Sequence, residues 1–179
     1  MQKSTKIKII LISIIILVCG TLAYVSTPKE KIKLKPPEID QNKLYEVVNV
    51  LDGDTFEIKI DKKVWKVRML GIDTPETLDP RKPVQCYGKE ASDKSKEILT
   101  NKSVKIEIDE TQDALDKYGR ILTYVYLGDN FVNEYLLQEG FAREYKYSKK
   151  YKFQTEFRKI EKEAKKEKKG LWLSCATLP

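Results

Sequence analysis

The alternation of apolar and polar residues in the first part of the folded region predicts a meander of three β-strands. Residues 45–51 are rich in valine and end at an Asp-Gly dipeptide, which is favoured in tight hairpin turns. Residues 55–60 alternate strictly, so we expect them to form the return strand. After a turn at residues 61–63, a third strand is expected over residues 64–72. It ends before Pro75, which lacks the N–H group that a central strand donates.

The rest of the folded region predicts helices that alternate with two further strands. Apolar residues at helical spacing predict a helix over 88–100 and another over 133–138 that ends at Gly140. A last helix is expected from Phe153 to Gly170, with Phe157, Ile160 and Ala164 on its apolar stripe. Strands are expected over residues 104–108 and 120–126. Five short strands with helices after the third strand, after the fifth and at the end predict an α+β domain. A small closed or partly open barrel capped by helices suits this order.

The N-terminal segment, residues 1–26, has the composition of a membrane-targeting sequence. Three lysines precede a stretch from Ile9 to Pro28 that carries no charge. Its densest part, residues 9–18, has the length of the apolar core of a signal peptide. Counting on to Val25 gives 17 mostly apolar residues, the lower limit for a helix that spans a bilayer. A cleaved signal peptide and a retained single-pass membrane anchor therefore both stay open, with the lysines inside the cell in either case.

Residues 27–41 are expected to form a linker, because they hold two adjacent prolines, interspersed Lys and Glu, and few large apolar groups. The folded domain is then expected over residues 42–179. The chain has 34 Lys and Arg against 27 Asp and Glu, a formal net charge of +7. Only +3 of it belongs to residues 42–179, which hold 27 basic and 24 acidic residues. Bulk charge is therefore a weak argument for binding nucleic acid.

The chain contains no histidine at all. This excludes a Ser-His or Cys-His nucleophile, a zinc ion held by histidine and a histidine general base. Catalysis must then come from carboxylates, Arg, Lys, Tyr, Cys or a metal ion bound by oxygen atoms.

Four carboxylates stand at strand ends of the predicted meander: Asp52, Asp54, Asp73 and Glu76. Strand ends of one sheet can converge, and paired carboxylates are ligands that suit Ca²⁺ or Mg²⁺. Asp52 is expected to shape the turn rather than to bind the ion, with Gly53 supplying a positive φ.

Two arginines complete the candidate chemistry. Arg68 lies five residues before Asp73, and Arg120 starts the fifth strand. Two forked guanidinium groups are suited to the charge of a phosphate under nucleophilic attack. Together with a metal ion and a carboxylate that activates water, they predict a site for phosphodiester hydrolysis.

Four ordered blocks of this sequence resemble the signature blocks of the thermonuclease, or staphylococcal nuclease-like, family. They are Asp52-Gly-Asp-Thr55, Arg68-Met-Leu-Gly-Ile-Asp-Thr-Pro-Glu-Thr77, Tyr87-Gly-Lys-Glu-Ala-Ser92 and Asp116-Lys-Tyr-Gly-Arg120. The resemblance covers about residues 43–175. It implies an OB-type five-stranded β-barrel with about three helices, and an enzyme that cleaves DNA and RNA to leave 5′-hydroxyl and 3′-phosphate ends.

The resemblance also implies a role for each matching residue. The ligands of Ca²⁺, or of Mg²⁺ or Mn²⁺ as alternatives, would be Asp54, Asp73 and the main-chain carbonyl of Thr74. Glu76 would activate the attacking water. Arg68 and Arg120 would bind the scissile phosphate. Lys117 and Tyr118 would hold the neighbouring phosphate, and Tyr145 and Tyr147 would flank the nucleotide pocket if one residue is deleted just before them.

The leading hypothesis is thus an exported, calcium-dependent and monomeric nuclease. It would be secreted or anchored at the outer face of the bacterial cytoplasmic membrane, and would contact the membrane only through an uncleaved N-terminal segment. A noncatalytic OB-fold module that binds single-stranded nucleic acid is the alternative. A protein that binds anionic lipid through its lysine-rich last helix is a third possibility. The presence of all five residues Asp54, Arg68, Asp73, Glu76 and Arg120 favours the enzyme.

The folded domain holds two cysteines, Cys86 and Cys175, while Cys19 lies in the N-terminal segment. An exported domain permits them to pair, and the compartment favours a disulfide. The alternative is two free thiols.

Overall fold

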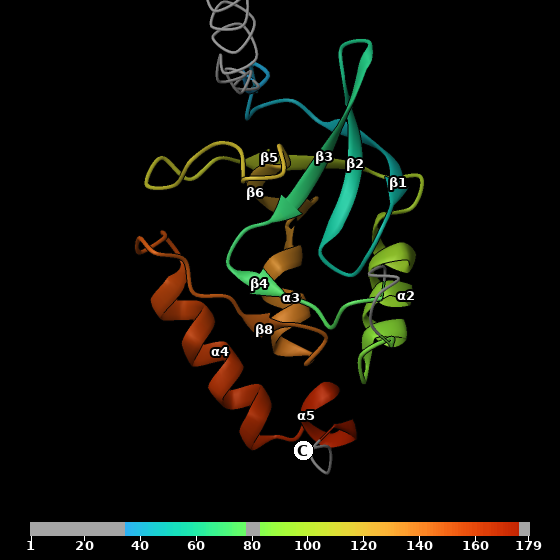
Figure 1. Cartoon of the computed structure of the whole chain (residues 1–179), viewed down its shortest axis with the longest axis vertical. Coiled ribbons are helices and arrows are strands. Elements are labelled where there is room, and N and C mark those ends of the chain that lie inside the picture. The colour runs from blue at the N-terminus through green and yellow to red at the C-terminus, as the bar shows by residue number, and fades with distance from the viewer. Residues whose placement is uncertain (1–34, 78–82, 176–179) are drawn as a thin grey trace, which may run out of the picture. The chain divides into compact units, whose positions relative to one another are not determined.

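The computed structural model describes residues 35–77 and 83–175 (Figure 1). The predicted signal or anchor, residues 1–26, and most of the predicted linker lie outside these described residues. None of the helices within the described ranges combines the length and the apolar character needed to cross a membrane. Ile39 packs on the domain core, and the side chain of Gln41 accepts a hydrogen bond of 2.9 Å from the Ile108 N–H. Packing against the barrel therefore begins a few residues before residue 42.

Five strands form a closed barrel, as the sequence predicts. They are β1 (Tyr45–Val50), β2 (Thr55–Ile60), β3 (Lys63–Met69), β5 (Ser103–Glu107) and β6 (Ile121–Leu127). The pairs β1–β2, β2–β3, β1–β5 and β5–β6 are antiparallel. The barrel closes because β3 also pairs with β6, in parallel, so that Arg68 lies opposite Leu122. This arrangement confirms the α+β class and the OB-type barrel.

The predicted third strand, residues 64–72, is interrupted. It ends at Met69, and the chain turns at Leu70 and Gly71 before a short strand β4 (Ile72–Asp73) pairs with β8 (Arg143–Glu144). Gly71 has φ +81°, and a side chain there would meet the rings of Tyr151 and Phe157. Trp65, Val67 and Met69 are buried on one parity of the strand, whereas Ile72 is buried on the other. The apolar pair Met69 and Leu70 bridges this change of face, so the run of apolar residues up to Ile72 reads as one strand.

The described residues form four helices, labelled in Figure 1: α2 (Gly88–Leu99), α3 (Val132–Gln138), α4 (Gln154–Lys166) and α5 (Leu171–Ser174). Helix α2 packs against β1, and α3 packs against α4 and β6. The two-residue strand β7 (Asn130–Phe131) pairs with β6 just before α3.

The last helix is shorter than predicted, since α4 ends at Lys166 and the short α5 follows after Gly170. Phe157 and Ala164 of the predicted stripe are buried. Gly140 follows α3 with φ +71°, so it has the left-handed backbone expected after that helix.

One buried carboxylate joins the barrel to the chain segment that follows β8. Asp109 accepts four hydrogen bonds: from the Tyr124 hydroxyl (2.7 Å), from the Lys152 N–H (2.8 Å), and from the N–H (2.9 Å) and hydroxyl (2.7 Å) of Thr111. Burial raises the pKa of Asp109, but these hydrogen bonds lower it by a larger amount. The pKa of Asp109 therefore lies below the ordinary value of an aspartate. Asp109 is therefore charged in the folded protein at neutral pH.

The depressed pKa of Asp109 predicts a stability that depends on pH. A carboxylate with a lowered folded-state pKa contributes stability above its unfolded-state pKa of about 4, and this contribution is lost as the pH falls through the folded-state value. Asp109→Asn should lower the free energy of unfolding by about 1–3 kcal/mol at pH 7. The difference from wild type should shrink below about pH 4. Urea unfolding of both proteins at pH 7 and pH 3 measures it, and an equal difference at both pH values would contradict the prediction.

Candidate active site

A cleft of about 570 Å³ opens between two loops at one end of β3 and β6. Seven of the residues that the sequence singles out line it: Arg68, Asp73, Lys117, Tyr118, Arg120, Tyr145 and Tyr147. A larger groove of about 690 Å³ lies between α3 and α4, but none of the predicted site residues lines it. The smaller cleft is therefore the candidate active site.

Arg68 forms the floor of the cleft and joins two carboxylates. Its side chain is almost completely buried, with Nη1 3.1 Å from Asp54 Oδ2 and Nη2 donating to Asp73 Oδ1 at 2.7 Å. Nη1 also donates to the carbonyls of Met69 (3.0 Å) and Ile72 (2.7 Å), at the turn that separates β3 from β4. Burial lowers the pKa of Arg68, but Asp54 and the other acidic groups nearby raise it above its ordinary value. The guanidinium therefore stays charged and brings both carboxylates to the same end of the barrel.

Asp54 is fixed by the segment that follows β4. The N–H and the hydroxyl of Thr74 donate to Asp54 Oδ2 at 2.9 and 3.1 Å, and the Thr55 hydroxyl donates to Asp54 Oδ1 at 2.9 Å. These bonds hold the 74–77 segment against the β1–β2 turn. They also bring Thr74 beside both predicted carboxylate ligands.

The expectation that Gly53 supplies a positive φ is wrong, because Gly53 is not among the glycines with left-handed backbone. A Cβ at position 53 would instead lie 2.7 Å from Thr74 Oγ1, so a glycine is needed for the close approach of the two segments. Asp52 does shape this turn: its carboxylate accepts from the Gly53 N–H and from the Thr77 hydroxyl, both at 2.8 Å.

Glu76 lies half-buried beyond the two carboxylates, and it is not among the residues that line the cleft. Its N–H donates to Gln85 Oε1 and its carbonyl accepts from the Gln85 N–H, both at 3.0 Å. Burial raises the pKa of Asp73, Arg68 lowers it, and Asp54 and Glu76 raise it again, so that it lies above its ordinary value. Glu76 is thus close enough to act electrostatically on Asp73.

Arg120 is oriented by Asp116, a residue that the sequence alone does not mark as functional. Asp116 accepts from Arg120 Nε at 2.7 Å, and its other oxygen accepts from the N–H groups of Tyr118 (2.9 Å) and Arg120 (3.0 Å). Gly119 between them has φ +79°. The signal for this role was an aspartate that starts a glycine-containing turn and stands four residues before the arginine.

Aromatic side chains stand on both walls of the cleft. Tyr118 is 71% exposed, with Lys117 Nζ 4.9 Å and Arg120 Cζ 5.3 Å from its ring centroid. On the other wall, the rings of Tyr145 and Tyr147 meet edge to face with centroids 4.8 Å apart. Burial, above all, raises the pKa of Tyr147 to about 12, so this side chain stays neutral at physiological pH.

The donor set of the site is compatible with a hard divalent cation. Within residues 35–77 and 83–175, no group of three or more acidic, Cys or His side chains could hold a metal ion. The predicted set is smaller, namely the carboxylates of Asp54 and Asp73 with the Thr74 carbonyl, and all of its donors are oxygen atoms. The negative charge of Asp54 also raises the pKa of both Asp52 and Asp73, after the larger effect of burial. A bound cation would relieve this crowding of carboxylates.

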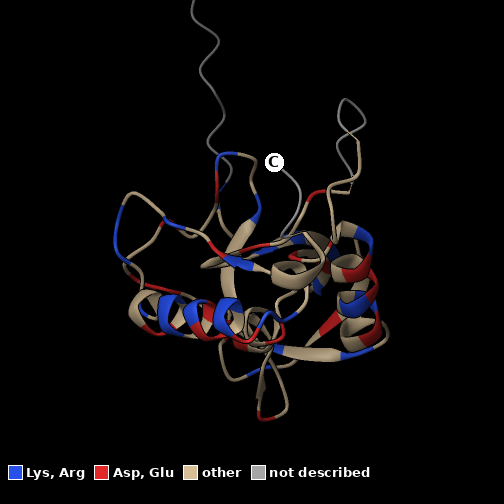
Figure 2. Cartoon of the chain, turned by 90° about the horizontal axis from the view of Figure 1, so that it is seen from below, with Lys and Arg blue, Asp and Glu red and all other residues tan. Residues whose placement is uncertain are grey.

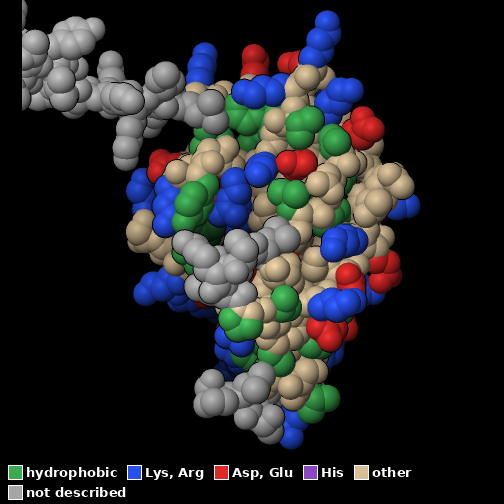
Figure 3. Space-filling view, turned by 45° about the vertical axis from the view of Figure 1, so that its right-hand side comes forward, with side chains coloured by type: hydrophobic (Ala, Val, Ile, Leu, Met, Phe, Trp, Pro, Cys, Tyr) green, Lys and Arg blue, Asp and Glu red, His purple; other side chains and the backbone are tan. Residues whose placement is uncertain are grey.

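Charge elsewhere on the described surface is mixed. The helices carry Lys and Arg beside Asp and Glu (Figure 2), and Figure 3 shows both signs interspersed over one face rather than gathered in a basic patch. On α4, Lys165 pairs with Glu161 at 2.9 Å. On the described face in Figure 3, therefore, no excess of positive charge marks a binding surface.

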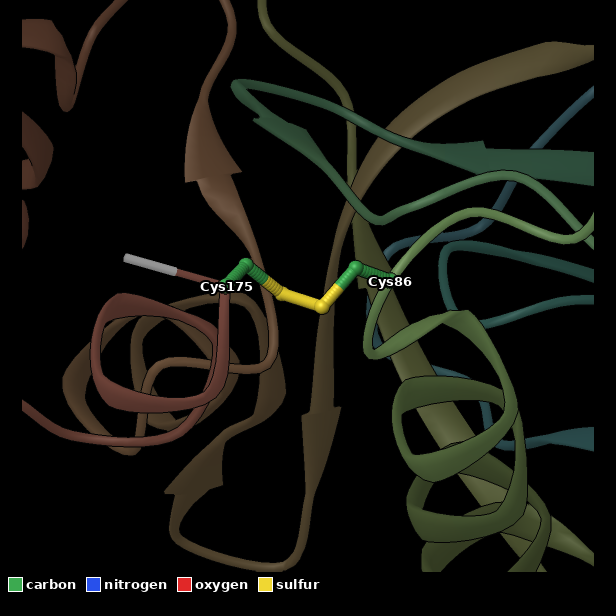
Figure 4. The surroundings of a disulfide bond; sticks show 2 residues. All are labelled: Cys86 and Cys175. Atoms are coloured by element: carbon green, nitrogen blue, oxygen red, sulfur yellow. A yellow bond between two sulfur atoms is a disulfide. The ribbon is translucent and has the colours of Figure 1, made fainter. Parts of the chain in front are cut away.

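The structure joins Cys86, just before α2, to Cys175, just after α5, by a disulfide (Figure 4). The bond links positions 89 residues apart in the sequence. It ties the end of the described chain to the turn just before α2.

The barrel carries a cleft lined by two arginines, Asp73 and exposed tyrosines, and the buried Asp54 is paired with one of these arginines. This combination is that of a barrel protein that acts on phosphodiesters. Comparison with known proteins agrees. A family model described as "Staphylococcal nuclease homologue" matches residues 66–174. The thermonucleases of Staphylococcus hyicus and Staphylococcus intermedius are 48% and 44% identical to this chain, each over 128 residues that cover 72% of this chain and 75% of the relative. Endonuclease YncB of Bacillus subtilis (strain 168) is 41% identical over 140 residues, which cover 76% of this chain and 66% of the relative.

The chain therefore belongs to the staphylococcal nuclease family. It is a nuclease that hydrolyses phosphodiester bonds, and its substrates are nucleic acids. This decides in favour of the enzyme over the noncatalytic module and the lipid-binding protein.

Proposed function

We propose that this protein is an exported, monomeric nuclease that uses Ca²⁺ to cleave both DNA and RNA and leaves 5′-hydroxyl and 3′-phosphate ends. The observation that carries the proposal is the meeting of Arg68, Asp73 and Arg120 in one cleft, with Asp54 bonded to the same guanidinium as Asp73. Mg²⁺ and Mn²⁺ have the same preference for oxygen ligands and are the alternatives to Ca²⁺.

The carboxylates of Asp54 and Asp73 and the carbonyl of Thr74 would hold the ion. Bound there, Ca²⁺ supplies positive charge that polarises the scissile phosphate. Asp54 is held in place before substrate arrives, because Thr74 donates two hydrogen bonds to its carboxylate and Arg68 forms an ion pair with it.

Glu76 is the general base in this proposal. Its carboxylate accepts a proton from a water molecule while the water oxygen attacks phosphorus in line with the departing 5′-oxygen. Cleavage of that bond leaves the phosphate on the 3′-oxygen, and the departing 5′-oxygen takes up a proton from solvent water to become the 5′-hydroxyl.

The two arginines stabilise the charge that develops on the phosphate. Arg68 and Arg120 donate N–H groups to its nonbridging oxygens, and Asp116 keeps the Arg120 guanidinium in place through the bond to Nε. Lys117 and Tyr118 bind the neighbouring phosphate, and Tyr145 with Tyr147 flanks the nucleotide on the opposite wall.

Two observations support export to the outer face of the membrane or beyond it. The N-terminal 26 residues have a targeting composition, as a cleaved signal or as a retained anchor. The disulfide between Cys86 and Cys175 is a kind of bond that persists in oxidising compartments and is rare in the cytosol.

The metal dependence is tested with residues 27–179, single-stranded DNA and RNA, and Ca²⁺, Mg²⁺ or Mn²⁺ added singly. We expect a chelator of Ca²⁺ to lower the cleavage rate by at least about 10³-fold, since a Lewis acid contributes several kcal/mol to stabilising the transition state. Excess Ca²⁺ added after the chelator should restore the rate. Enzymatic labelling of the products at free 5′-hydroxyl groups, without prior phosphatase treatment, reads the ends. Cleavage that proceeds unchanged in chelator would contradict the proposal.

A further inference from the structure

The main chain of Glu76 is paired with a residue nine positions further on. The Glu76 N–H donates to the side-chain oxygen of Gln85, and the Gln85 N–H donates to the Glu76 carbonyl, both at 3.0 Å. Gly88, at the start of α2, packs against the same segment: a Cβ there would lie 3.2 Å from the Pro75 carbonyl oxygen and 3.3 Å from that of Glu76. The segment 85–88 therefore forms one support of the Glu76 backbone.

A second support lies on the other side of Glu76. The Thr77 hydroxyl donates to Asp52 at 2.8 Å, which ties the chain after Glu76 to the β1–β2 turn. That turn is in turn held by α2, since the Ser95 hydroxyl donates to the Gly53 carbonyl. The supports differ in one respect: Asp52 and Ser95 belong to the barrel and the middle of α2, whereas Gln85 lies in the exposed turn before α2.

The turn that carries Gln85 is itself fixed by the C-terminal part of the domain. Cys86, the next residue, is bonded to Cys175 (Figure 4). Tyr87 has a left-handed backbone with φ +67°, and its ring stacks on Phe141 with centroids 5.7 Å apart. Leu171 of α5 is buried, so the far end of the disulfide is anchored to the domain. Gln85 is thus held both by α2, whose first residue Gly88 donates to the Gln85 carbonyl, and by the C-terminal part of the domain through the neighbouring Cys86.

We propose that Gln85 is a positioning residue for Glu76, and that the Cys86–Cys175 disulfide fixes Gln85 in this role. The inference rests on the proposed function of Glu76 as general base. Gln85 makes two hydrogen bonds to the Glu76 main chain, so it acts on the rate through the position of Glu76. A displacement of a catalytic group by about 1 Å can lower a rate about 100-fold. The two hydrogen bonds that hold the Glu76 main chain are therefore sufficient to affect the rate.

Gln85→Met tests the first part, since it keeps the length of the side chain but removes the acceptor. In the full chain, purified in detergent, we expect kcat for single-stranded DNA to fall about 10-fold or more, with KM nearly unchanged. Gln85→Glu keeps an oxygen acceptor for the Glu76 N–H and should recover most of the rate. Gln138→Met, an exposed change of the same kind in the α3–α4 groove, is the matched control and should leave kcat unaltered. A Gln85→Met enzyme with native kcat overturns the proposal.

A double-mutant cycle separates this inference from the proposed function. If Gln85 acts through Glu76, then Gln85→Met should cause no further loss in a Glu76→Gln background. An equal loss in both backgrounds would show that Gln85 acts in another way and would overturn the inference. A Glu76→Gln enzyme with native turnover would instead overturn the proposed role of Glu76.

Reduction tests the role of the disulfide. A dithiol reductant supplies two electrons and two protons, converts the Cys86–Cys175 bond to two thiols, and is itself oxidised to a disulfide. Rates are normalised to the folded fraction, measured by circular dichroism at the assay temperature. The normalised kcat should fall about as much as in Gln85→Met, with no further fall when Gln85→Met itself is reduced. A normalised kcat that survives reduction intact overturns the role of the disulfide.

Discussion

Replacing Glu76 by glutamine should lower the turnover number by about 10²- to 10⁴-fold, the range that a positioned general base contributes. The amide has nearly the same shape as the carboxylate but cannot accept the proton of the attacking water. The backbone bonds between Glu76 and Gln85 do not involve the carboxylate, so the substitution leaves them in place. The loss should therefore appear in kcat, measured with single-stranded DNA at saturating Ca²⁺, while the urea unfolding midpoint stays close to that of the wild type.

Glu97→Gln is a matched control for this substitution, because it removes the same charge from the exposed surface of α2, where Glu97 is paired with Lys94. It should keep the full rate. If Glu76→Gln retained a rate within a few-fold of wild type while the control behaved as expected, another group would have to accept the proton.

The barrel could be predicted from the sequence because several of its strands alternate between buried and exposed positions, although β6 is buried on both faces from Ile121 to Val125. Phe56, Ile58 and Ile60 alternate with polar residues, so the period of two is visible in a single chain. The break at Gly71 and the division between α4 and α5 were not visible. Both depend on contacts with distant segments, such as the packing of Gly71 against Tyr151 and Phe157.

Most residues of the candidate site could be found because they stand in three short blocks, residues 52–55, 68–77 and 116–120. The roles of the residues that support them could not be found in this way. Asp116 stands in one of these blocks, but the sequence alone does not show that it orients Arg120. Gln85 carries no signal of its own, since a lone glutamine before a helix is an ordinary surface residue. The sequence suggests the wrong physical cause for Gly53, because the close approach of Thr74 comes from a segment 21 residues further on. Local patterns thus predict which groups act, and tertiary packing decides what holds them.

Loss of the Cys86–Cys175 disulfide should lower the free energy of unfolding by about 4–5 kcal/mol. The bond closes a loop across a sequence separation of 89 residues. In the chain-entropy model, a closed loop of that length removes about this much conformational freedom from the unfolded state. Since domains of this size are stable by only about 5–15 kcal/mol, the effect is a large share of the total. Urea unfolding of wild type and of Cys86→Ser, Cys175→Ser and the double variant measures it.

The three variants distinguish loss of the bond from loss of local packing. Each single substitution removes the whole bond, so the cross-link model requires nearly the same loss in all three and no additivity between the two sites. A loss below about 1 kcal/mol in all three would contradict the cross-link model. Losses that add would instead assign the effect to separate contacts of Cys86 and Cys175. The same variants also test the proposed effect on catalysis, because Gln85 is the neighbour of Cys86, whose disulfide partner Cys175 lies just after α5. If that bond supports Glu76 as well as the fold, the variants should lose kcat even at low urea concentrations, where they remain folded.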